Sequence, residues 1–164
     1  MKKNFLNQKN GGNFGTNDVK MKNKYQNQNT ETKVEEPMVA YANPLNIIDT
    51  ARKGIKISNA LDLVNKLGLS QLEFANILHV SLRTVQRFES SKLLDSDGSS
   101  KIIQLQNINT KGVNVFGSQS SFNQWIRTPL LSLNNKTPLQ YFDTPFGFQL
   151  IEQLLGRIEH GIFA

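Results

Sequence analysis

Polar side chains that could recognise a nucleic acid are concentrated in one short segment of the chain. They are Ser81, Arg83, Thr84, Gln86 and Arg87. Arginine can donate two hydrogen bonds to guanine, and glutamine can bind adenine in the same bidentate way. Hydroxyl groups at the start of a helix suit phosphate oxygens. If Val85 and Phe88 face a core, these five residues share the opposite, exposed face of a helix. The spacing predicts a DNA-binding surface, and a solvated basic face of an ordinary helical bundle is the alternative.

The remaining titratable residues do not form a recognisable catalytic or metal-binding pattern. The chain has two histidines and no cysteine, and no motif joins His79 to His160. Asp95 and Asp97 precede Gly98, but the rest of a calcium-binding loop is missing. The sequence contains no glycine-rich loop of the kind that holds a phosphate. We therefore expect a protein without enzymatic activity, cofactor, metal or small-molecule substrate.

The elements that would position the polar segment read as a helix-turn-helix. Ser70 and Glu73 form a capping-box pattern at the start of a predicted helix 71–78. A turn at His79 follows, and Ser81 can cap a second predicted helix, 82–90. Glycine is usual in such a turn, but histidine also tolerates positive φ. Ala75 lies where the two helices would touch, and the predicted core side is apolar: Phe74, Leu78, Val80, Val85 and Phe88.

Helical periodicity also extends over most of the chain on either side of this motif. It predicts helices over 45–53, 58–67, 101–116 and 145–160, and another that begins after Ser118. Residues 95–100 read as a polar break. Threonine-proline pairs at 137–138 and 144–145 are typical helix starts. Because no alternating strand pattern occurs, the predicted fold class is all-α.

The organisation of the chain follows from its composition. Half of residues 1–36 are Asn, Gln or Lys, which leaves too little apolar surface to offset the entropy of folding. We predict a disordered tail over 1–43, a helix-turn-helix domain over 44–95 and a second helical domain over 96–164.

The charge is unevenly distributed along the chain. The net charge is +6, and residues 52–92 carry seven basic against three acidic groups, whereas residues 93–164 are neutral. A basic half favours a polyanionic partner. No membrane-spanning apolar run and no secretory signal is present, so we expect a cytoplasmic protein without a membrane partner.

Several motifs resemble those of one known family. Leu82–Arg87 in the helix-turn-helix resembles the Xre/MbcA/ParS antitoxin family. So do three later stretches: Trp125-Ile126-Arg127-Thr128-Pro129, Lys136-Thr137-Pro138-Leu139, and Leu154-Leu155-Gly156-Arg157-Ile158-Glu159-His160-Gly161. In the turn before Lys136, Asn134 or Asn135 replaces the expected glycine, and asparagine also accepts a left-handed turn. The Asn/Lys-rich N-terminal segment is not part of the pattern.

The resemblance implies partners that the residues alone do not reveal. Members pair with RES-domain toxins that degrade NAD⁺, bind their operator DNA through the first domain, and dimerise and seal the toxin's active-site cleft through the second. Together with the apolar Phe163 that follows the last predicted helix, the resemblance favours toxin contact by the last segment: Arg157, His160, Gly161, Ile162, Phe163 and Ala164.

Other interpretations of the same residues stay open. Phe163 could enter a partner's cleft or fold back onto its own helix. Arg157 and His160 could simply oppose the negative end of the helix dipole. At the level of function, the alternatives are a plain helix-turn-helix repressor with a dimerising C-terminal domain and a phage-type regulator with a small-molecule sensor.

Overall fold

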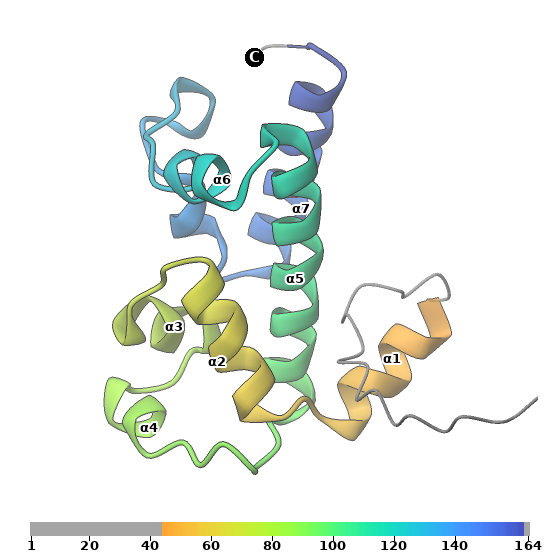
Figure 1. Ribbon diagram of the computed structural model, residues 1–164, viewed down its shortest axis with the longest axis vertical. Coiled ribbons are helices and arrows are strands. Elements are labelled where there is room, and N and C mark those ends of the chain that lie inside the picture. Colours follow the sequence, from red (N-terminus) through yellow and green to blue (C-terminus); the bar gives the residue numbers. More distant parts are fainter. Residues whose placement is uncertain (1–43, 163–164) are drawn as a thin grey trace, which may run out of the picture. The chain divides into compact units, whose positions relative to one another are not determined.

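A computed structural model describes residues 44–162, which fold into helices joined by short connections (Figure 1). The α-helices are α1 (Pro44–Lys53), α2 (Ile57–Lys66), α3 (Gln71–Leu78), α4 (Leu82–Gln86), α5 (Ser96–Phe116), α6 (Gln119–Trp125) and α7 (Pro145–Glu159), and the 3₁₀ helices are η1 (Leu131–Leu133) and η2 (Pro138–Tyr141). Within this range the only β pairings are two isolated bridges. The predicted all-α class is confirmed. The predicted tail, residues 1–43, lies outside the described residues.

Two helix boundaries differ from the prediction by more than one residue. Helix α5 begins at Ser96 because the Asp95 carboxylate accepts the Gly98 N–H at 2.8 Å, so the polar segment 95–100 is a cap and first turn rather than a break. Helix α4 ends at Gln86, not at residue 90. The chain after α4 instead pairs with the start of α2, where the Ile57 N–H donates to the Lys92 carbonyl at 2.9 Å.

Helix α5 has the most extensive packing of the described elements. It packs against α1 and α3 and also against α6 and α7. Its buried residues include Ile102, Leu105 and Ile108. A single long helix therefore supports both the helix-turn-helix and the C-terminal helices. The predicted domain boundary at residues 95–96 coincides with the start of α5 and stays a prediction.

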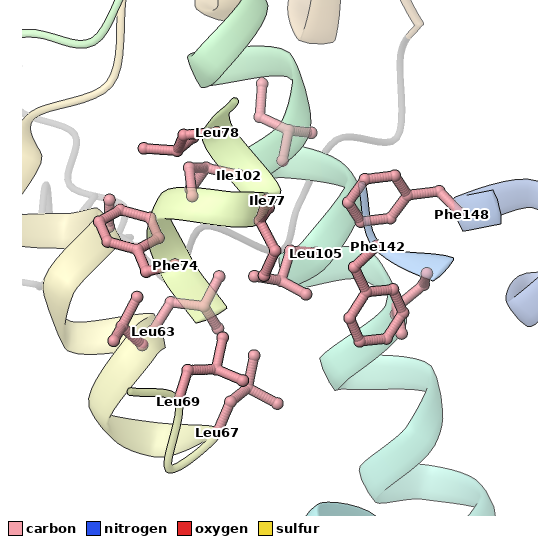
Figure 2. Packing of buried hydrophobic residues seen from close by; sticks show 14 of the residues in the cluster. Leu63, Leu67, Leu69, Phe74, Ile77, Leu78, Ile102, Leu105, Phe142 and Phe148 are labelled. Carbon is pink, nitrogen blue, oxygen red and sulfur yellow. The ribbon is translucent and has the colours of Figure 1, made fainter. Parts of the chain in front are cut away.

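The hydrophobic core is continuous from α1 to α7. Figure 2 shows Leu63 of α2 and Phe74 of α3 close to Ile102 and Leu105 of α5, and Phe142 and Phe148 extend the cluster towards α7. The Phe142 and Phe148 rings stack at a centroid distance of 5.4 Å. Aromatic pairs of this kind add to the stability that their buried area provides.

No helix in the described range is long and apolar enough to cross a bilayer.

Candidate DNA and toxin interfaces

The helix-turn-helix is built by the local interactions that its sequence predicts. The Ser70 N–H donates to Glu73 Oε2 at 2.7 Å, and the Glu73 N–H donates to Ser70 Oγ at 3.2 Å, which completes the capping box of α3. His79 adopts the left-handed conformation at φ 57° and ends α3. Fully buried Ala75 and Phe74 complete the predicted inner side of α3. The pair α3–α4 thus has the predicted motif, with histidine in place of the usual glycine.

The exposed face of α4 carries all five residues predicted to contact DNA. Ser81, Arg83, Thr84, Gln86 and Arg87 are each exposed. On the opposite side Val85 is buried, and the Phe88 ring meets Phe74 edge-on at a centroid distance of 6.3 Å. The Ser81 hydroxyl caps α4 by accepting the Thr84 N–H at 3.1 Å. Because the apolar side anchors α4, its polar side faces outward, and DNA contact by these residues stays a prediction.

A hollow of about 480 Å³ lies beside this face of α4. Four of the five predicted DNA-binding residues line it: Ser81, Arg83, Thr84 and Arg87. Lys92 lines it from the connection that follows α4, and Gln86 is not among its lining residues. The sequence analysis did not single out Lys92. It predicted a helix that continues to residue 90, and therefore did not predict that the chain turns back towards α2 after Gln86.

A second set of contacts joins the helix-turn-helix to the C-terminal helices. Arg127 donates from Nη2 to the Gly68 carbonyl at 2.6 Å and lies 3.5 Å from the Glu73 carboxylate. Asn123 donates to the Lys66 carbonyl at 2.8 Å. His79 Nε2 hydrogen-bonds to the Asp143 carbonyl. Four of these residues also line a second hollow, of about 700 Å³, between the two halves: Glu73, His79, Arg127 and Asp143.

The last residues of α7 form a well-defined helix end. The Ile162 N–H donates to the Arg157 carbonyl at 2.8 Å, and the Gly161 N–H donates to the Ile158 carbonyl at 3.0 Å. With Gly161 at φ 69°, these two bonds make a Schellman motif. Arg157, His160, Gly161 and Ile162 are all exposed. Phe163 and Ala164 lie outside the described residues, so toxin contact by this segment stays a prediction.

Two protein-family models match consecutive segments of this chain. Residues 47–107 match the antitoxin Xre-like helix-turn-helix domain. Residues 111–161 match the antitoxin Xre/MbcA/ParS C-terminal toxin-binding domain. The chain belongs to the Xre/MbcA/ParS antitoxin family. The family suggested by the four sequence motifs is therefore confirmed.

Individual relatives of this antitoxin-family protein are distant. The antitoxin Xre of Photorhabdus laumondii is 30% identical over 92 residues, which cover 55% of this chain and 62% of that relative. The Prs ADP-ribosylating antitoxin of a Sphingobium species is 22% identical over 133 residues, 75% of this chain and 84% of that relative. A chain in the crystal structure of the M. tuberculosis MbcT–MbcA toxin–antitoxin complex is 19% identical with a TM-score of 0.49, covering 67% of this chain and 100% of that chain.

The toxin-binding domain of this antitoxin-family protein also exposes apolar side chains that the sequence analysis did not single out. Phe146 is 83% exposed and Leu150 is 41% exposed, one turn apart on α7. Arg157 follows two turns after Leu150, so helical periodicity places all three on one outer strip of α7. We call Phe146, Leu150 and Arg157 the α7 strip. The spacing i, i+4, i+11 could have revealed the α7 strip from the sequence. The apolar periodicity of the buried face of the same helix is stronger, and the prediction followed that pattern.

The titratable side chains of the family domains do not gather into a centre. Within residues 44–162, no three side chains of the kinds that bind metals lie close enough to hold an ion. His79 and His160 occupy different places, a turn between α3 and α4 and the end of α7. Two exposed features stand out in the described chain, the polar face of α4 and the α7 strip.

Proposed function

We propose that this protein is the antitoxin of a RES-domain toxin that degrades NAD⁺. The observation that carries the proposal is the coincidence of the toxin-binding family match, residues 111–161, with the α7 strip. Aromatic residues and arginine, represented here by Phe146 and Arg157 on one strip of α7, are the residue types in which protein interfaces concentrate their binding energy. The name of the Sphingobium relative refers to ADP-ribosylation, a reaction that consumes NAD⁺, and this supports the chemistry of the proposed toxin.

The terminal segment is the part that we place nearest the toxin's active site. It comprises Arg157, His160, Gly161, Ile162, Phe163 and Ala164. The Schellman motif ends α7 at a defined point and leaves Ile162 exposed. A short segment held at a helix end can enter a cleft at a small entropic cost, because its base is already ordered. Contact along the α7 strip would add the surrounding area.

The helix-turn-helix gives the protein a second role in this proposal, repression of its own operon in the cytoplasm. The exposed residues of α4 would contact operator DNA, and a homodimer would place two copies of α4 on a palindromic site. Half-sites should then be about 34 Å apart, one turn of DNA, or a multiple of that distance. The basic charge of residues 52–92 supports this assignment.

Co-expression with the product of the adjacent gene tests the toxin assignment, with cell growth and NAD⁺ level as readouts. Toxin alone should stop growth and deplete NAD⁺, and the pair should grow normally and co-purify. Leu150→Asp should weaken neutralisation because it places a charge in the α7 strip. Leu72→Asp makes the same change at an exposed leucine of α3 and should neutralise normally. If the adjacent product is harmless alone, or the two proteins do not co-purify, a plain repressor with a dimerising C-terminal domain is the better description.

A further inference from the structure

The hollow beside α4 brings together cations from two parts of the chain. Its polar lining is Ser81, Arg83, Thr84, Arg87, Glu89 and Lys92. The two arginines come from α4 and its C-terminal end, whereas Lys92 comes from the connection to α5. Three cations against one carboxylate leave the hollow with a net positive charge of two. Such a site attracts an anion.

The position of Lys92 is fixed by backbone hydrogen bonds rather than by its side chain. The Ile57 N–H donates to the Lys92 carbonyl at 2.9 Å, and the Leu94 N–H donates to the Ile55 carbonyl at 2.8 Å. The Ser58 N–H also donates to the Ser90 carbonyl at 3.1 Å. This pairing holds the connection against the start of α2. Lys92 is therefore presented to the hollow by a fixed backbone, which reduces the ordering entropy of a contact.

The partner that Lys92 has in the structure is one that an anion could replace. Lys92 Nζ lies 2.8 Å from Glu89 Oε1, and the two side chains are 64% and 63% exposed. An exposed ion pair of this kind contributes little to stability, because water screens it. Exchange of the Glu89 carboxylate for a phosphate oxygen would therefore cost little free energy. In that bound state Glu89 would repel the same phosphate and limit its affinity.

We propose that this hollow binds one phosphate of the DNA backbone, with Lys92, Arg83 and Arg87 as its cationic partners and Glu89 as a restraint on affinity. The inference rests on the proposed operator binding, and it assigns different kinds of DNA contact to different residues of the α4 face. Residues that line the hollow position the protein on the backbone, whereas Gln86, outside the hollow, is left to contact a base edge. The DNA backbone is the expected source of the phosphate because the hollow adjoins the face that would enter the groove.

The experiment measures binding of the full-length protein to its own promoter and to a scrambled duplex by fluorescence anisotropy between 50 and 200 mM NaCl, conditions in which phosphate contacts dominate the salt dependence. Lys92→Gln should weaken both duplexes by a similar factor and flatten the slope of log K against log salt by about 0.9, the loss of one phosphate contact. Glu89→Gln should strengthen binding to both duplexes. As a control, Lys136→Gln removes the same charge from an exposed lysine of the C-terminal half. It should change neither the affinity for DNA nor the salt slope.

Each result separates this site from the wider proposal. If the wild-type protein binds no promoter DNA, the operator function is wrong and the phosphate site falls with it. If the wild type binds but Lys92→Gln keeps the wild-type slope, operator binding stands and the phosphate site is wrong. A loss of affinity in Glu89→Gln would show that Glu89 positions Lys92 instead of restraining the phosphate. Displacement of DNA by millimolar inorganic phosphate at constant ionic strength would identify a free anion, not the backbone, as the ligand.

Discussion

On the face of α4, side chains of the same general character have different surroundings. The Ser81 and Thr84 hydroxyls hydrogen-bond to each other at 2.8 Å, so part of their bonding capacity serves the helix start. Arg83 and Arg87 line the basic hollow, and Gln86 is exposed outside it. Because backbone contacts position a protein and base contacts specify a sequence, these differences predict different phenotypes for neighbouring residues.

Substitutions on α4 should separate these two kinds of contact. Arg83→Ala and Arg87→Ala should each weaken promoter binding in a gel shift, together with binding to unrelated DNA. Gln86→Ala should mainly reduce the preference for the promoter, by about 1–3 kcal/mol if it removes a bidentate contact. Gln149→Ala, an exposed glutamine on α7, is the matched control. Wild-type promoter binding by both arginine variants would mean that this face of α4 is misassigned.

Residue-scale features were predictable from the sequence where the interacting groups are neighbours in the chain. The capping box at Ser70 and the cap at Ser81 involve partners three residues away, and the left-handed turns at His79, Asn134 and Asn135 are properties of single residues. The contact of Arg127 with the Gly68 carbonyl joins residues 59 apart, and no local pattern encodes it. The same reason explains why Lys92 was missed.

At the scale of the element, α5 shows how packing overrides helix propensity. Gly112 lies inside this helix, where glycine is unfavourable by about 1 kcal/mol relative to alanine. A Cβ atom on Gly112 would lie 2.2 Å from Cδ2 and Cε2 of the Phe122 ring. That ring is fully buried beside Phe116 and Trp125, at centroid distances of 6.3 and 6.0 Å. The glycine weakens the helix locally and allows α6 to pack closely against it.

Two glycine-to-alanine substitutions should therefore have opposite effects on the melting temperature. Gly112→Ala should lower it, because overpacking costs about 1–3 kcal/mol and outweighs the gain in propensity. Gly156→Ala in α7 should raise it slightly, since the nearest atom to its Cβ is the flexible Lys111 Nζ at 3.3 Å. Each kcal/mol corresponds to about 2–4 °C for a protein of this size. Thermal denaturation followed by circular dichroism measures both, and a stabilised Gly112→Ala would show that Phe122 can move aside.

At the scale of the whole molecule, the two family domains share one structural support. Helix α5 contacts α1 and α3 of the helix-turn-helix half and α6 and α7 of the toxin-binding half. The boundary between the two family matches, near residues 107–111, falls inside this helix. Periodicity could predict α5 but not its double role, because which faces meet is set by residues distant in sequence. The exposed sites lie on other elements, α4 and α7, so substitutions there leave the shared core intact.

The terminal segment provides the decisive test of how the proposed toxin is inhibited. Removal of Ile162–Ala164, or Arg157→Ala, should weaken neutralisation in co-expressing cells, because a cleft-filling inhibitor depends on a few central contacts. Both variants should keep the helical circular dichroism signal and promoter binding: α7 is held by buried Ile151 and Leu155, and the Arg157 backbone carbonyl survives the substitution. Arg52→Ala, an exposed arginine of α1 outside the toxin-binding match, is the control. If the shortened protein neutralises as well as the full chain, the partner is right but the terminal segment is not the inhibitory element. Neutralisation would then depend on the helical surface of the C-terminal half, and Leu150→Asp should abolish it even when the terminal residues are present.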